Sequence, residues 1–134
     1  MQIAVDTNIV VRFLTHDDDG QYQQAYAVFQ SPRVYIPNTV FLETEWVLRY
    51  AYEYQPSDII QAFTMLLGLF NVEAEEPSRI AIVLQWHQAS LDFADALHLA
   101  SSQHCDELYT FDSDFVKRGK DVSVSTCVVK KPGE

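Results

Sequence analysis

The sequence predicts an α/β protein with a three-layer α/β/α arrangement, in which helices cover both faces of a central parallel sheet. Three observations lead to this class. Short apolar segments that suit strands alternate with longer segments whose apolar residues recur at helical spacing. The strand-like segments are almost continuously apolar, as is typical of parallel strands covered on both faces. A length of 134 residues suits one core, so we expect a single domain over residues 1–134.

The N-terminal half carries two of the expected strands. The segment "QIAVD" (2–6) is short, apolar and ends in an aspartate, and "VYI" (34–36) is closed by a proline. Between them, "TNIVVRFL" predicts one helix. A second helix is indicated by apolar residues at helical spacing, which end at a Ser-Pro pair: Tyr22, Ala25, Tyr26 and Phe29.

The rest of the chain continues this alternation. We expect a long helix from Asn38 or Thr39 to about Tyr54, then a helix that Ser57 caps and whose apolar face reaches Phe70. A helix opening at "PSRIAIVLQWH" and another at "LDFADALHLA" follow. The segment "ELYT" (107–110) predicts a strand, "FDSDFVKRG" a turn with a short helix, and "VSVST" (122–126) a final strand.

Composition limits the possible partners. The formal net charge is −10, from 19 acidic and nine basic residues, which argues against a broad nucleic-acid-binding face and allows metal cations or a basic partner. No apolar run approaches the roughly 20 residues that span a bilayer. The N-terminus lacks the pattern of a signal peptide, so we expect a cytoplasmic protein with no membrane association. Cys105 and Cys127 have no framework spacing and are expected to be reduced thiols.

Isolated acids fall where strands end and helices begin. Asp6 ends the first strand, Asp112 follows the "ELYT" strand, and Asp92 and Asp95 open a helix. The carboxyl ends of parallel strands and the N-termini of the following helices share one edge of such a sheet, so these acids can meet there. For Asp92 and Asp95 alone, helix capping and the helix dipole are a sufficient explanation.

Glu43 stands out on its helix. On a helical wheel, Glu45, Arg49 and Glu53 share a polar arc at i,i+4 spacing, as on an ordinary wet face. Glu43 falls between the apolar positions of Trp46 and Tyr50, so we expect it to face the core. Because a buried carboxylate without compensation costs several kcal/mol, Glu43 is either a protonated gap in the core, or pairs with a base, or binds a cation.

Several acids at one sheet edge require a positive charge among them. Two carboxylates 4 Å apart repel by about 4 kcal/mol at an effective dielectric near 20. Oxygen ligands suit a hard cation such as Mg²⁺, with Mn²⁺ able to substitute. Such an ion activates water and neutralises charge on a phosphate, which is the chemistry of phosphodiester cleavage.

Four ordered segments carry a resemblance to a known family. They are "VDTNIVVRFL", "FLETEWVLRY", "DFADALHLA" and "LYTFDSDF", and they span nearly the whole chain. In this order and spacing they resemble the PIN-domain ribonucleases, in particular the VapC toxins of type II toxin–antitoxin pairs. The resemblance implies a Mg²⁺-dependent endoribonuclease whose metal-activated water hydrolyses RNA, a cognate antitoxin partner and a homodimer.

The resemblance also implies roles for individual residues. The catalytic, metal-binding acids would be Asp6, Glu43, Asp95 and Asp112. Periodicity alone does not decide whether Asp92 or Asp95 is the direct metal ligand, and the family pattern favours Asp95. For the second pair, Asp112 and Asp114 are both possible ligands, and proximity to the strand favours Asp112. The supporting residues would be Thr7, Asn8, Asp92, Thr110 and Asp114. From proximity to Asp112 alone, the RNA backbone would be held by Lys117, Arg118 and Lys120.

Two other functions fit parts of the sequence. A PIN-like scaffold without catalysis would bind RNA or protein only, although retention of all four acids counts against it. The segment "LYTFDSDFV" also resembles the nucleophile motif of haloacid-dehalogenase-type phosphatases, with Asp112 as nucleophile and Asp114 as acid/base. That family needs further lysine and acidic motifs downstream, and only about twenty residues follow.

Overall fold

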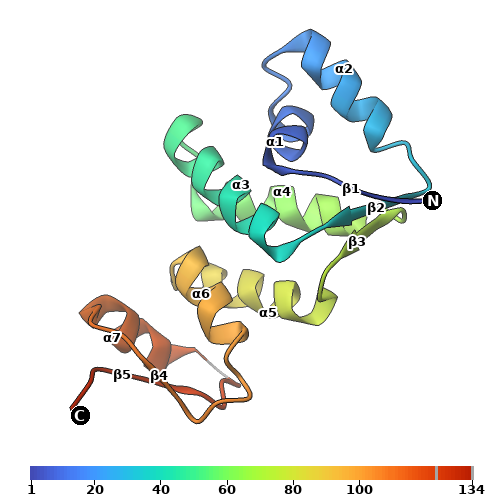
Figure 1. Cartoon of the computed structure of the whole chain (residues 1–134). Helices are drawn as coiled ribbons and strands as arrows, with labels where there is room; N and C mark the ends of the chain where they lie inside the picture. Colours follow the sequence, from blue (N-terminus) through green and yellow to red (C-terminus); the bar gives the residue numbers. More distant parts are fainter. Residues whose placement is uncertain (123, 134) are drawn as a thin grey trace. The chain divides into compact units, whose positions relative to one another are not determined.

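The computed structural model describes residues 1–122 and 124–133. The chain forms two compact units, Met1–Pro77 and Ser78–Glu134, and each is described by itself. Both units combine helices with parallel strands, so the predicted α/β class is confirmed (Figure 1). The expectation of one functional domain over residues 1–134 stays a prediction.

The first unit contains a three-stranded parallel sheet. Its strands are β1 (Gln2–Ala4), β2 (Arg33–Ile36) and β3 (Val72–Ala74), in the order β1-β2-β3. Ile3 pairs with Val34, and Val34 pairs with Val72. Strand β3 escapes the sequence prediction because it is only three residues long and has a glutamate at its centre.

Four helices complete this unit: α1 (Thr7–Thr15), α2 (Asp19–Val28), α3 (Asn38–Ala51) and α4 (Pro56–Gly68). Helix α1 packs against α2 and α3, and α4 packs against β3. Helix α4 begins at Pro56 rather than after Ser57, because Asp58 accepts a hydrogen bond from the Gln55 backbone N–H at 2.8 Å. Large fully buried side chains fill the core: Ile36, Phe41, Leu48, Ile59, Phe63 and Leu66.

The second unit contains a two-stranded parallel sheet. Helix α5 (Pro77–Gln88) leads into this unit, α6 (Phe93–Ala100) follows, and β4 (Glu107–Tyr109), α7 (Ser113–Asp121) and β5 (Val128–Lys130) form a β-α-β unit. Helix α7 approaches β5 closely at Gly119, where a Cβ atom would lie 2.8 Å from a methyl carbon of Val129. The five strands of the described chain therefore lie in two sheets, one in each unit.

Two further predicted element boundaries are wrong. The last strand is Val128–Lys130, not residues 122–126: Val122 follows α7, residue 123 lies outside the described residues, and 124–126 are not extended in a sheet. The alternation of valine with polar residues in "VSVST" is typical of a half-buried strand. In the structure it is Val129 that pairs with Leu108 and is buried. Helix α3 ends at Ala51 rather than near Tyr54, and Glu53 takes a left-handed conformation (φ 58°) just after it.

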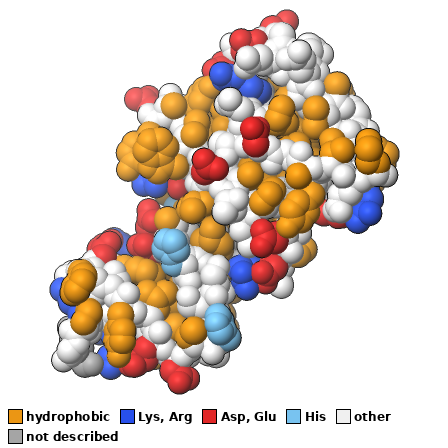
Figure 2. All heavy atoms as spheres, viewed as in Figure 1, with side chains coloured by type: hydrophobic (Ala, Val, Ile, Leu, Met, Phe, Trp, Pro, Cys, Tyr) orange, Lys and Arg blue, Asp and Glu red, His pale blue; other side chains and the backbone are white. Residues whose placement is uncertain are grey.

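Charge and hydropathy are distributed as the composition suggests. Acidic side chains are scattered over the face shown in Figure 2, and basic ones are sparse. None of the helices within the described residues combines the length and the apolar character that a transmembrane span needs. Cys105 is exposed and Cys127 is buried, and both are free thiols.

Candidate functional site

Asp6 caps the helix that follows the first strand. It follows Val5 in extended conformation, and its Oδ1 accepts a hydrogen bond from the backbone N–H of Ile9 at 3.3 Å. The carboxylate thus lies at the positive end of the α1 dipole, where negative charge is stabilised. The second carboxylate oxygen of Asp6 has no hydrogen bond within residues 1–122 and 124–133, so it is available to a ligand.

Thr7 connects Asp6 to Glu43. Thr7 is the first residue of α1, and its hydroxyl donates a hydrogen bond to Oε1 of Glu43 on α3 at 3.3 Å. The contact between α1 and α3 therefore brings two predicted metal-binding acids of the first unit to the same helix N-terminus. Thr7 thus links α1 to α3, and its supporting role in a metal site stays a prediction.

The orientation of α3 corrects the helical-wheel prediction. Glu43 is exposed and does not face the core, and the neighbouring Trp46 and Tyr50 side chains are 58% and 62% exposed. Glu45, expected on a wet face, is only 1% exposed and forms an ion pair with Arg49 at 2.8 Å. The carboxylate that the fold buries on this helix is thus Glu45, and Arg49 compensates its charge.

The reason for the error lies in which arc of α3 packs inward. Phe41, Thr44 and Leu48 are fully buried, and Glu45 lies within the same arc. Their i, i+3, i+4, i+7 spacing is a core signal in its own right. The wheel gives angles between side chains, but it cannot tell which of two partly apolar arcs faces the sheet.

In the second unit, Asp92 and Asp95 open α6. Asp92 is the N-cap, and its Oδ2 accepts a hydrogen bond from the backbone N–H of Asp95 at 3.2 Å. Asp95 is half-buried in the first turn, and its own carboxylate accepts no hydrogen bond from any residue that the structure describes. Asp92 thus has the capping role, while the carboxylate of Asp95 lacks a hydrogen-bond donor among the described residues.

This environment raises the pKa of Asp95. Burial raises it most, and the negative charges of Asp92, Asp112 and Asp114 raise it further. His98, one turn along α6, opposes the shift, and the resulting pKa is about 6. Because the carboxylate of Asp112 on α7 acts on Asp95 on α6, the N-termini of these two helices bring their acids close together.

Asp112 is held by the turn before α7. Its Oδ1 accepts hydrogen bonds from the backbone N–H groups of Asp114 (2.9 Å) and Phe115 (3.3 Å), and its own N–H donates to the Thr110 hydroxyl at 3.0 Å. Its other carboxylate oxygen has no hydrogen bond within the described part of the chain. Asp114, the alternative to Asp112, is 70% exposed and contacts Arg118 at 3.4 Å.

The expected RNA-binding residues separate into two groups. Lys117 and Lys120 line a pocket of about 410 Å³, and Lys131 lines the same pocket. Arg118 is not among the lining residues and forms an ion pair with Asp114. Sequence proximity does not join Lys131 to this group, because only the packing of α7 on β5 brings residues 117–120 and 131 together.

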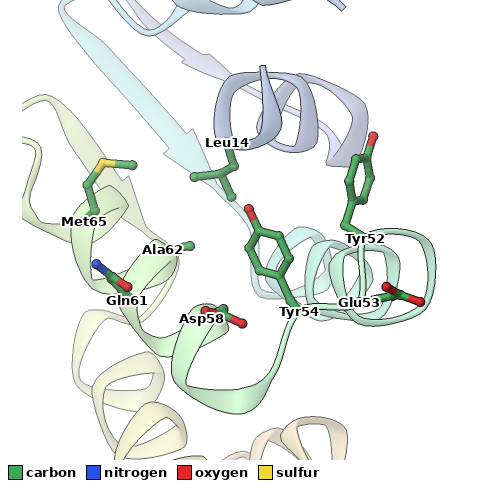
Figure 3. A pocket seen from close by; sticks show the side chains of 8 residues that line it. All are labelled: Leu14, Tyr52, Glu53, Tyr54, Asp58, Gln61, Ala62 and Met65. Atoms are coloured by element: carbon green, nitrogen blue, oxygen red, sulfur yellow. The ribbon is translucent and has the colours of Figure 1, made fainter. Parts of the chain in front are cut away.

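Two other pockets lie in the first unit. A pocket of about 550 Å³ is lined by residues 52–54, which follow α3, by residues of α4 and by Leu14 of α1 (Figure 3). None of the predicted site residues lines it. Asn8, expected to support the site, is exposed and lines a smaller pocket of about 170 Å³ with Arg12 and Gln21.

The oxygen donors suit a hard cation, although they do not form a closed cage. Across residues 1–122 and 124–133, no group of three or more His, Cys, Asp or Glu side chains is arranged to hold a metal ion. Mg²⁺ does not need such a group, since it keeps several waters and commonly binds through one or two carboxylates together with substrate phosphates. The oxygens without a hydrogen bond on Asp6, Glu43, Asp95 and Asp112 are donors of this kind.

Comparisons with solved structures and with protein-family patterns each give a match. The solved structures that resemble the chain include the Mycobacterium tuberculosis toxin VapC20, described as a sarcin-ricin loop cleaving toxin, with 23% sequence identity and a TM-score of 0.43. That match covers 88% of this chain and 95% of the toxin. Comparison with curated protein sequences gives no match. The sequence pattern of the PIN domain matches residues 3–121, which is most of the chain, and the protein therefore belongs to the PIN domain family.

Proposed function

We propose that this PIN domain protein is a Mg²⁺-dependent endoribonuclease and the toxin of a type II toxin–antitoxin pair. Asp6, Glu43, Asp95 and Asp112 are the proposed metal-binding residues, and Mn²⁺ is expected to substitute for Mg²⁺. Membership of the PIN family supports nuclease chemistry, because PIN nucleases use divalent metals. The oxygen-only donor set supports a hard cation.

The observation that carries the proposal is that the Asp95 carboxylate is half-buried and accepts no hydrogen bond from a described residue. A half-buried carboxylate normally has a hydrogen-bond donor or a base beside it. Asp95 accepts no hydrogen bond within the described residues. His98 lowers its pKa, but burial and the charges of three further aspartates outweigh this effect and raise the pKa to about 6. A divalent ion supplies the positive charge that this arrangement lacks, which is a physical reason for these acids to be gathered.

The chain's own residues orient the acids. Backbone N–H groups hold one oxygen of Asp6 and one of Asp112, and the Thr7 hydroxyl holds one oxygen of Glu43. Each carboxylate therefore has a fixed direction and one oxygen left for ligand binding. When bound, a divalent ion neutralises charge on the phosphate and acidifies a coordinated water.

RNA cleavage with purified protein tests the proposal. We expect the parent protein to cut RNA with Mg²⁺ or Mn²⁺ and not with EDTA, and we expect Asp6→Asn and Asp95→Asn to lose at least about 100-fold in rate. Asp106→Asn makes the same chemical change at an exposed residue outside the proposed site and should keep the parental rate. A folded Asp6→Asn variant that cuts at the parental rate contradicts the assignment.

The same experiment separates the two other functions. A scaffold without catalysis would cut no RNA under any metal condition. A phosphatase of the haloacid-dehalogenase type would release phosphate from a small phosphomonoester in an Asp112-dependent reaction. Against the phosphatase, Asp114, its required acid/base, forms an ion pair with Arg118 on α7.

We also infer an antitoxin partner and a homodimer. An excess of ten negative charges favours a partner that brings Arg or Lys side chains to the acids. The neighbouring aromatic side chains of Trp46 and Tyr50, with ring centroids 4.8 Å apart and both more than half exposed, are the proposed centre of the contact between two copies.

A further inference from the structure

The basic residues of this acidic protein are of two kinds. Six of the nine have an ionic or other interaction partner. Five of these pairs are Arg12–Asp17, Arg33–Glu73, Arg49–Glu45, Arg118–Asp114 and Lys130–Glu107, and Arg79 also interacts. The other three, Lys117, Lys120 and Lys131, have no hydrogen bond or ion pair within residues 1–122 and 124–133.

All three of these lysines line one pocket in the second unit. The pocket measures about 410 Å³, and Ser113, Val116 and Asp121 complete its lining. Lys117 and Lys120 are exposed and Lys131 is half-buried, so a ligand can reach all three charges. Three lysines against one aspartate give the pocket a positive charge in a protein whose net charge is strongly negative.

The fold brings these lysines together. Lys117 and Lys120 are three residues apart on α7 and so project from neighbouring positions on one side of the helix. Lys131 directly follows β5, and the close approach of Gly119 to Val129 draws α7 onto that strand. The pocket is therefore a consequence of the α7–β5 contact, and a chain without a small residue at position 119 would hold the strand and helix farther apart.

We propose that Lys117, Lys120 and Lys131 form a subsite for backbone phosphates of single-stranded RNA. The inference rests on the proposed ribonuclease function and adds the surface that holds the substrate. The pocket begins at Ser113, which directly follows Asp112, and Lys120 lies about 10 Å farther along the helix at 1.5 Å per residue. An RNA strand lying along α7 thus places one phosphate at the acids while the lysines hold its neighbours.

Lysine is able to fill this role. A phosphodiester backbone presents successive single charges in variable orientation, and a lysine ammonium on its flexible stem binds as a point charge without fixed geometry. The subsite assigns no role to Arg118, whose guanidinium contacts Asp114. It adds Lys131, which sequence proximity to Asp112 does not identify.

RNA binding under conditions without cleavage tests the subsite. The probe is a fluorescent 12-nucleotide single-stranded RNA in EDTA, titrated with the full chain at several salt concentrations. The triple variant Lys117→Gln/Lys120→Gln/Lys131→Gln is compared with Arg12→Gln/Arg33→Gln/Lys130→Gln, which removes the same number of charges from residues that have ion-pair partners. Circular dichroism and melting curves confirm that both variants fold.

We expect the pocket variant to lose at least about tenfold in affinity at low salt. The slope of log K against log salt should become less negative by about 2, because each of three phosphate contacts on a single strand contributes about 0.7. The matched variant should keep most of the parental slope. Equal losses in both variants would show that only net charge matters, and parental binding by the pocket variant would show that the lysines do not touch RNA. Either result overturns the subsite.

Two more measurements separate this inference from others. A glutamate-rich peptide that binds the pocket lysines in place of RNA would assign the pocket to an acidic protein segment and also overturn the subsite. RNA cleavage by the parent in Mg²⁺ is measured in parallel. If the parent cuts RNA while the pocket variant binds normally, only the subsite fails; if the pocket binds RNA and the parent cuts nothing, the ribonuclease proposal fails and the subsite stands.

Discussion

Asp95 destabilises the folded, metal-free chain at neutral pH. Its pKa is about 6 in the folded protein against an ordinary value of 3.8. A carboxyl group whose pKa is raised by folding holds its proton more tightly in the folded state than in the unfolded state. Stability is therefore unaffected below pH 3.8 and falls as the pH rises toward 6, and above that pH the full penalty remains.

Replacing this carboxylate removes the penalty. In EDTA at pH 7, Asp95→Asn should be more stable than the parent by on the order of 1–2 kcal/mol, after a discount for partial exposure, and should melt several degrees higher. At pH 4 the two proteins should melt at nearly the same temperature. Melting curves at both pH values check this, and a variant that melts lower than the parent at pH 7 would show that Asp95 is already compensated.

At the scale of elements, the contact between α7 and β5 depends on one glycine. Alanine normally favours a helix interior over glycine by about 1 kcal/mol. At Gly119, however, the added Cβ would lie 2.8 Å from Cγ2 and 3.1 Å from Cβ of Val129, which is buried and β-branched and so has little freedom to move.

The clash should exceed the gain in helix propensity. We expect Gly119→Ala to lower the free energy of unfolding by about 1–3 kcal/mol, as overpacking does, and to weaken RNA binding through the displaced lysines. The double variant Gly119→Ala/Val129→Ala makes room for the new methyl group and should recover part of the loss relative to Val129→Ala alone. Denaturant unfolding of the three variants measures this coupling, and additive effects would contradict a direct contact.

Elements whose ends carry polar signals were the ones predicted well. Asp92 is predicted to begin a helix because its side chain can bond a free N–H group, and it does so in the structure. The matching role of Asp6 at the start of α1 is found only in the structure. The strand at Val128–Lys130 was missed because its position depends on pairing with Glu107–Tyr109, a contact between distant segments. Likewise, the burial of Glu45 depends on how α3 packs, which a helical wheel does not contain.

At the scale of the whole molecule, sequence order identified the family, while the candidate site was only partly predictable. The four motifs placed the acids at strand ends and helix starts, and the PIN match confirms the family. They could not show that Thr7 bonds Glu43, or that Lys131 joins Lys117 in one pocket, because both contacts depend on how helices pack. The joint use of Asp6, Glu43, Asp95 and Asp112 by one ion stays a prediction.

The proposed homodimer is a second prediction at this scale. Trp46 and Tyr50 form an exposed aromatic pair on α3, and a partner copy would remove this apolar surface from water. Light scattering after gel filtration should give a dimer mass for the parent and a monomer mass for Trp46→Ser. Phe70→Ser changes a different aromatic residue, which is fully exposed, and this variant should remain dimeric. A monomeric parent would refute the contact.

The most direct test of the metal proposal is the binding of Mn²⁺ to the protein without RNA, measured by isothermal titration. We predict saturable binding by the parent, a loss of at least about tenfold in affinity in Asp6→Asn and in Asp95→Asn, and parental affinity in Asp106→Asn. Because Asp6 and Asp95 belong to different units of the chain, losses in both variants would show that acids from both contribute to ion binding. Binding that neither substitution changes, or no binding by the folded parent, would contradict the account.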